Sequence, residues 1–318
     1  MTYRYDIIAK IIISAPIIFL FSANTYGQFD AKKCKKLISA DYTNENFSQK
    51  DLLKAVRNDT LLLINCLSNE VIDSLSYEKS YAIISKLKTI TSKSKNEITQ
   101  KATIKYYIKL SRNYNSSVSS LALKELRLFP RTLYDSSDIQ NISKSIDSKF
   151  KAYNDIVLIV GYICHQNFTE TINRVFPNSR VFNKQERWAT HIALARLGNE
   201  SALNYCTSRA ASLTLSDQVI DIIYPDLIYT HNKQAYDILV EALYSDDKKC
   251  SSLNPNSDSK IICGYRIVEL LAPKIRNFPI KVLPSGDLDV SNYQAAIEIA
   301  REWFKINFEN YEIIDNAY

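Results

Sequence analysis

The main pattern in this 318-residue chain is a series of short segments in which apolar residues recur at helical spacing between polar turns. Apolar side chains three and four residues apart share one face of a helix, so each segment predicts a short amphipathic helix. From residue 116 onward the segments form pairs. First helices are predicted at 119–129, 155–166, 188–199, 218–232 and 264–275, and second helices at 136–146, 168–176, 200–213, 233–244 and 291–308.

The pairs follow one another at a nearly constant period. Leu123, Leu158, Leu194 and Leu227 hold matching positions and are separated by 35, 36 and 33 residues. Helices this short are unstable alone, and stacking pair upon pair buries their apolar faces as one core. Such a period, with two helices in each unit, is typical of helical repeats. The sequence therefore predicts an all-α fold, a right-handed α-solenoid of antiparallel helix pairs.

Local signals agree with the helix ends. Serine stands where three N-caps are expected, at Ser136, Ser216 and Ser291, and Gly198 stands where a left-handed C-terminal cap is expected. Pro225 falls inside a helical segment and predicts a kink, because proline lacks the amide hydrogen that the helix uses. The final segment, 291–308, carries Trp303, Phe304 and Phe308 and is expected to cap the stack.

Composition narrows the fold further and limits the chemistry. Only five residues are Gly, which disfavours sandwiches, barrels and doubly wound sheets because these use Gly in turns with positive φ. The chain has no G-x-S-x-G, no Gly-rich phosphate loop and no H-E-x-x-H motif. We expect no cofactor and no nucleic-acid partner.

The N-terminus has the pattern of an export signal. A basic start is followed by an apolar run at 11–21 and then by small residues. Eleven helical residues rise only about 16 Å, roughly half the apolar thickness of a bilayer. We therefore predict a signal peptide at 1–27 and an exported protein, periplasmic or extracellular, without a transmembrane span after the signal is removed. An uncleaved anchoring helix is the alternative.

Export makes the six cysteines candidates for disulfides. Cys250 and Cys263 bracket a polar insertion between two helical segments, and a bond between them would clamp it. Cys34 with Cys66 is the second choice, since it would tie the first mature helix to a later one. Cys164 and Cys206 lie in apolar helical contexts and are equally consistent with buried free thiols.

Residues 28–115 form an N-terminal helical region that we expect to continue into the repeats at 116–318. One face of its predicted basic helix carries Lys101, Lys105, Lys109 and Arg112, at i, i+4, i+8 and i+11. The favoured interpretation is an ordinary solvated face. The alternative is a stripe that binds an acidic partner or an anionic polymer.

The segment ALARLGNESAL, at 193–203, resembles the short HEAT-like repeats found in phycobilin-lyase-type helical proteins. Residues 234–243 look like the second helix of the same unit one period later, and His231 occupies the place of Gly198. A tetratricopeptide unit would have Tyr three residues after the Gly, where this chain has Ser201. The resemblance implies a scaffold whose concave surface binds a macromolecular partner, most often a protein.

Few side chains suggest catalysis. Asp217, Asp221 and Asp226 are the best carboxylate cluster, and an all-α enzyme acting on a polysaccharide or cell-wall polymer is the alternative function. The three histidines are His165, His191 and His231, of which the first and third are assigned to equivalent turns two units apart. That separation is too large for a shared metal ion. We predict no metal site.

Two surface features leave further options open. The interval 28–199 has 27 Lys and Arg against 16 Asp and Glu, a net charge of +11, while 200–318 has 11 against 17, a net charge of −6. Opposite ends could therefore attract each other in a head-to-tail assembly. Tyrosine is frequent, and some of the 21 could line a groove rather than fill the core, namely Tyr106, Tyr107, Tyr224, Tyr229, Tyr236 and Tyr244.

Overall fold

The structure, a computed structural model, describes residues 76–91, 96–147, 149–176, 182–251 and 259–314. These residues form twelve α-helices and little strand, so the all-α class is confirmed. The signal peptide at 1–27 and the Cys34–Cys66 pair lie outside the described residues. No helix in the described ranges is both long enough and apolar enough to cross a membrane.

Ten of the helices correspond to the segments of the five predicted pairs, and one of the two helices that precede them is the predicted basic helix. Their bounds are α3 (Tyr77–Thr91), α4 (Glu97–Leu110), α5 (Ser116–Leu126), α6 (Ser136–Ser143), α7 (Tyr153–Ile163), α8 (Asn167–Val175), α9 (Lys184–Arg196), α10 (Glu200–Ala211), α11 (Tyr224–Tyr229), α12 (Lys233–Leu243), α13 (Gly264–Leu271) and α14 (Tyr293–Asn307). Short 3₁₀ turns lie at Arg131–Leu133 and Ala272–Lys274.

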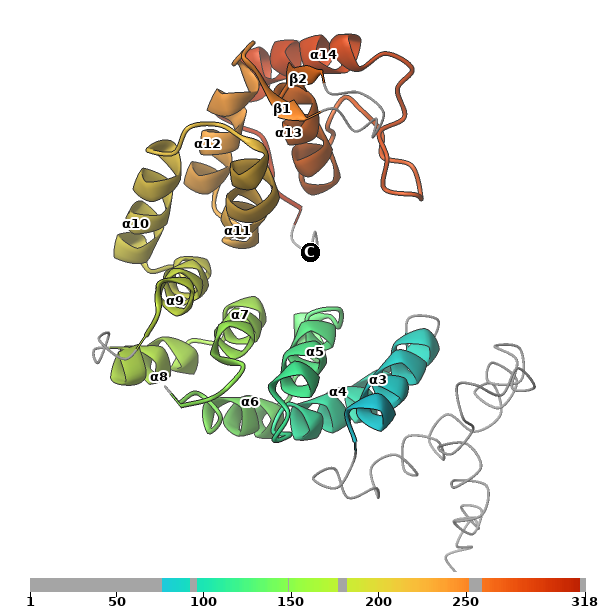
Figure 1. The fold of residues 1–318 in the computed structure, drawn as a ribbon, viewed down its shortest axis with the longest axis vertical. Helices are drawn as coiled ribbons and strands as arrows, with labels where there is room; N and C mark the ends of the chain where they lie inside the picture. The colour runs from blue at the N-terminus through green and yellow to red at the C-terminus, as the bar shows by residue number, and fades with distance from the viewer. Residues whose placement is uncertain (1–75, 92–95, 148, 177–181, 252–258, 315–318) are drawn as a thin grey trace, which may run out of the picture.

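The helices follow an arch (Figure 1). The helices α5, α7, α9 and α11 lie along its inner side, and α4, α6, α8 and α10 lie along its outer side. Neighbours in each row pack together: α5 on α7 and α7 on α9 inside, α4 on α6 and α10 on α12 outside. One continuous set of buried apolar side chains fills the space between the rows.

Most helices begin at an asparagine or aspartate. Two of the predicted serine caps are displaced by one residue, because Asp135 caps α6 and Asn292 caps α14. The Asp135 Oδ1 atom accepts hydrogen bonds from the Ser137 and Asp138 amides at 2.8 and 2.9 Å. A carboxylate or amide oxygen reaches two free amides of the first turn, which explains why it is used in place of the adjacent serine.

Three inner helices end at a residue in the left-handed conformation. These residues are Cys164, Gly198 and His231, with φ of 58°, 88° and 56°, separated by 34 and 33 residues. The cap predicted at Gly198 is confirmed, and the Asn199 amide donates to the Leu194 carbonyl at 3.0 Å. The assignment of His165 to this turn position was wrong by one residue, because Cys164 holds it.

Proline changes the helix of the fourth pair as expected. The segment before Pro225 is a π-helix, η4 (Val219–Ile223), and the α-helix α11 begins at the next residue. A π-helical turn shifts the hydrogen-bond pattern at the point where proline supplies no amide hydrogen. The predicted kink therefore takes the form of a π-helical turn.

The polar insertion departs from a purely helical fold. The strands β1 (Lys248–Ser251) and β2 (Lys260–Ile262) form an antiparallel two-stranded sheet. The Sγ atoms of Cys250 and Cys263 lie 2.14 Å apart, so the predicted pair is confirmed at disulfide distance. Beyond it, α14 packs on α12 and α13, and Phe304 is completely buried.

The inner row is packed very closely at α7 and α9. Gly161 on α7 faces Ala193 on α9, where an added Cβ would lie 3.0 Å from the Ala193 Cα. The Tyr229 hydroxyl of α11 donates to the Leu158 carbonyl of α7, so α11 reaches across α9. Small residues on α7 and α9 permit this contact.

A candidate partner-binding groove

A hollow of about 750 Å³ lies where the N-terminal end of α9, the C-terminal end of α10 and η4 meet. We name it the Trp188 groove. Its lining residues are Lys184, Arg187, Trp188, Tyr205, Arg209, Leu213, Thr214, Ser216, Gln218, Val219, Ile222 and Ile223. Two of these residues, Trp188 and Tyr205, lie at the two ends of the segment 188–205, where the most regular helix pair was predicted.

The position of Trp188 follows from local structure. Asn183 caps α9, and its hydrogen bonds with the Glu186 amide and carboxylate close a capping box, which fixes the first turn. One turn later the Trp188 Nε1 atom donates to the Asp226 Oδ2 atom of α11 at 2.6 Å. The indole therefore bridges α9 and α11 and forms part of the groove surface.

The partner of this indole is an unusually placed carboxyl group. Burial raises the pKa of Asp226, while the Trp188 hydrogen bond and the positive charge of Arg127 act in the opposite direction. Beside Trp188, with the two ring centroids 6.5 Å apart, Tyr205 stacks on His191 with ring centroids 4.1 Å apart. Burial also lowers the pKa of His191, which favours the neutral ring. Each of the two aromatic side chains is thus held by a partner, Trp188 by Asp226 and Tyr205 by His191.

The groove combines positive charge with exposed apolar surface. Lys184, Arg187 and Arg209 contribute three cationic groups, and no carboxylate is among the lining residues. Lys184 and Arg209 form no ion pair within the described part of the chain. Tyr205 is 47% exposed and Ile222 is 60% exposed. Such a surface suits a partner that presents a carboxylate beside an aliphatic or aromatic side chain.

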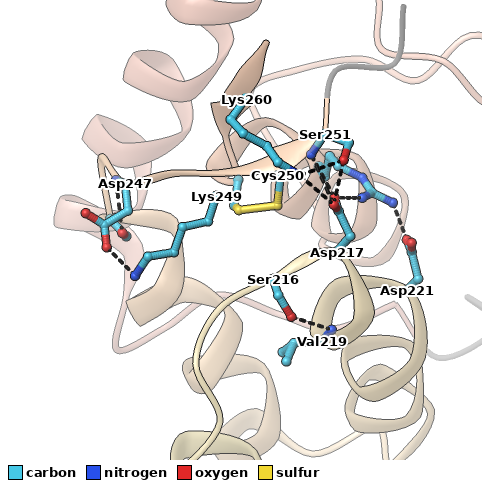
Figure 2. Close-up of a disulfide and its surroundings, with 12 residues drawn as sticks. Ser216, Asp217, Val219, Asp221, Asp247, Lys249, Cys250, Ser251 and Lys260 are labelled. Carbon is cyan, nitrogen blue, oxygen red and sulfur yellow. Dashed lines mark hydrogen bonds and ion pairs between the residues drawn. A yellow bond between two sulfur atoms is a disulfide. The ribbon is translucent and has the colours of Figure 1, made fainter. Parts of the chain in front are cut away.

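The disulfide hairpin braces one wall of the groove (Figure 2). Asp217, which precedes η4, accepts hydrogen bonds from the Ser251 amide at 3.0 Å and from the Ser251 hydroxyl at 2.8 Å. Arg266 of α13 binds Asp217 at 2.7 Å and also binds Asp221. Because η4 supplies Val219, Ile222 and Ile223 to the groove, these contacts fix that wall in place.

The three candidate carboxylates have different partners and do not form one group. Asp217 and Asp221 share Arg266, whereas Asp226 lies against Trp188. A pair of carboxylates that flanks a glycosidic bond must face a common substrate. Here two of the three bind one arginine, so their arrangement does not favour the polysaccharide enzyme.

The predicted basic stripe is engaged within the fold. Lys101 pairs with Glu97 at 3.3 Å, and Lys105 pairs with Asp135 of the next outer helix at 3.0 Å. Arg112 donates to the Asn141 carbonyl at 2.7 Å. Lys109 also has an interaction within the protein. Lys105 and Arg112 therefore connect α4 with the α6 segment, and the role of the stripe in partner binding stays a prediction.

The remaining candidates fall elsewhere. Five of the six tyrosines proposed for a groove are buried, and Tyr244 is partly exposed. Cys164 is an exposed free thiol and Cys206 a buried one. Within the described ranges, no group of three His, Cys, Asp or Glu side chains is placed to hold a metal ion.

A second hollow, of about 610 Å³, also lies beside the start of α9. Tyr77 and Tyr81 line it together with polar residues from the N-terminal ends of α5 and α7, and with Asn183 and Glu186. The first turn of α9 therefore contributes to both hollows.

Sequence reasoning did not identify Lys184, Arg209 or Ile222. Lys184 and Arg209 have no distinctive sequence context, Ile222 lies in a predicted apolar helix, and only the packing of three elements brings them together. One sequence signal for the groove was present. The segment 218–232 has more apolar residues than its buried face needs, and Ile222 is one of those left exposed. No protein-family model, curated protein or solved structure matches this chain.

Proposed function

We propose that this protein is an exported, right-handed α-solenoid of HEAT-like repeats that binds a protein partner on its curved surface. The order of helices, with neighbours packed in two rows, supports the repeat interpretation. So do the left-handed turns at Cys164, Gly198 and His231, which recur after 34 and 33 residues. Stacked units of this kind form extended curved binding surfaces.

The Trp188 groove is the proposed anchoring point for the partner. The observation that carries this proposal is the combination of three cationic side chains, exposed Tyr205 and Ile222, and no lining carboxylate. The expectation that the partner also occupies the concave face is retained as part of the proposal. At the C-terminal end of α9, one of the inner helices, Arg196 lies over the rings of Tyr162 and Tyr229 at 5.5 and 4.7 Å.

Site-specific photocrosslinking tests the proposal. A photoreactive amino acid replaces Ile222 in the groove or Ile98 on α4, which are 60% and 62% exposed and thus closely matched. In cells that produce the protein, we expect a discrete adduct from position 222 and none from position 98. Adducts of equal yield at both positions, or none at either, would overturn the proposal.

Charge reversal provides the second part of the test. Arg209→Glu should abolish the adduct formed at position 222, because it places a carboxylate beside an acidic partner. Lys144→Glu is the matched control, since Lys144 is an exposed cation on the outer side of the arch. An adduct that survives Arg209→Glu would show that the cationic rim does not select the partner.

A further inference from the structure

A surface with the opposite character occurs on the last helix of the same chain. On α14, Ile299, Glu302 and Ile306 follow one another at i, i+3 and i+7 and share one face. Ile299 is 46% exposed and Ile306 is 82% exposed. Glu298 and Glu309 flank them and are also exposed. We name these five residues the α14 strip.

The α14 strip is negative overall. It has three glutamates, of which Glu302 pairs with Lys305, while the other nearby cation of α14, Arg301, pairs with Asp246. Glu309 forms no ion pair within the described part of the chain. The Trp188 groove has three cations and no carboxylate. The two surfaces therefore match in both respects, since each places charge of one sign beside exposed aliphatic side chains.

The two surfaces cannot meet within one molecule. The groove lies at α9, α10 and η4, whereas α14 lies at the end of the arch (Figure 1). We propose that the α14 strip of one copy docks in the Trp188 groove of a second copy, with Ile306 against Trp188 and Ile222. This inference rests on the proposed function, because it names a second copy as the partner of that groove.

The geometry of such a contact determines the assembly. The two surfaces differ, so the contact is heterologous, and each added copy leaves one groove and one strip unoccupied. The chain then grows head to tail into rings or filaments. The α14 strip has five residues, whereas a stable interface of about 1,600 Å² uses about 20–30 residues on each side, so we expect weak association that depends on concentration. The charged rim makes it sensitive to salt.

Sedimentation of the purified protein tests the proposal. At about 0.01 M salt the weight-average mass should rise with concentration, and at about 1 M salt it should fall toward that of the monomer. Ile306→Asp and Arg209→Glu should each weaken association at least tenfold, which corresponds to about 1.4 kcal/mol. The matched controls Ile98→Asp and Lys144→Glu should leave it unchanged.

Exchanging the charges across the contact distinguishes specific docking from nonspecific association. Arg209→Glu combined with Glu309→Arg in the same chain restores opposite charges across the contact, and it should recover most of the association. A monomer at every concentration and salt, or a double variant no better than the single ones, would overturn the second-copy proposal.

The outcome also separates this inference from the proposed function. If the purified protein is monomeric but position 222 still crosslinks to a different protein, the second-copy proposal fails and the proposed function stands. If the adduct at position 222 has twice the mass of the chain, both are supported. If the protein is monomeric and forms no adduct, both fail.

Discussion

The structure predicts that Gly161→Ala destabilises the protein, although replacing glycine by alanine within a helix usually stabilises it. Glycine inside a helix is ordinarily less stable than alanine by about 1 kcal/mol, so this change would stabilise an isolated α7. Here the added Cβ would overlap the Tyr229 hydroxyl and approach the Ala193 Cα to 3.0 Å. Both neighbours are held in place, because the hydroxyl donates a hydrogen bond to the Leu158 carbonyl and the Ala193 Cα belongs to the backbone of α9.

The magnitude follows from these opposing effects. Overpacking a closely packed site costs about 1–3 kcal/mol, which exceeds the gain in helix propensity. We therefore expect Gly161→Ala to lower the free energy of unfolding by about 1 kcal/mol. Urea unfolding followed by circular dichroism measures this change, with an unchanged slope as the sign that the unfolded state is unaffected.

Tyr229→Phe supplies the decisive comparison. It removes the hydroxyl and one hydrogen bond, at a cost of about 1 kcal/mol, and it also removes the atom that the new Cβ would meet first. Gly161→Ala should therefore cost about 1 kcal/mol less in the Tyr229→Phe background than in the original protein. Equal costs in both backgrounds, or a stabilising Gly161→Ala, would refute the close approach of α7, α9 and α11.

Three further predictions concern the groove and the cysteines. Replacing both Cys250 and Cys263 by Ser should lower the free energy of unfolding by about 3 kcal/mol, which is the chain-entropy value for a loop near this length. It should also weaken formation of the adduct at position 222, and an unchanged urea midpoint would contradict the prediction. Burial raises the folded-state pKa of Asp226, so its contribution to stability falls as pH rises from its ordinary value of 3.8 through the raised one. Asp226→Asn, which still accepts the indole hydrogen bond, should flatten that part of the pH–stability curve measured by thermal unfolding, and an unaltered curve would refute the assignment. A thiol reagent should label exposed Cys164 rapidly and leave Cys206 unlabelled in the folded state, because burial raises the pKa of Cys206 to about 12; equal labelling rates would contradict the packing of α10.

Much of the secondary structure followed from local pattern. Apolar periodicity located the helices of five pairs, and Gly198 marked a real left-handed turn. The errors are of one kind. Ser136 and Ser291 were preferred to the adjacent Asp135 and Asn292, and His165 to Cys164. The start of a helix is decided by which side-chain oxygen reaches the free amides, and its end by which residue takes the left-handed conformation. A pattern of apolar residues places either only to within a residue.

The groove was less accessible to sequence reasoning. The segment 188–205 drew attention as the most regular helix pair, yet three of the groove's distinctive residues went unnoticed. For the Lys101 stripe, the sequence favoured a solvated face and left partner binding as the alternative, and the fold pairs Lys105 and Arg112 with residues of the α6 segment. Charge spacing on one helix shows which residues share a face. It does not show whether the next helix supplies their partners.

The sequence by itself determined the helical class, the pairing of Cys250 with Cys263 and the left-handed turn at Gly198. These depend on residues close together along the chain, and the chemistry of each short segment is sufficient to fix them. Only the tertiary structure decided that Arg209, Trp188 and Ile222 line one groove and that Asp217 and Asp221 share an arginine. Those arrangements depend on how closely α9, α10 and η4 pack, because contacts between distant segments are set by the shapes of all the side chains between them.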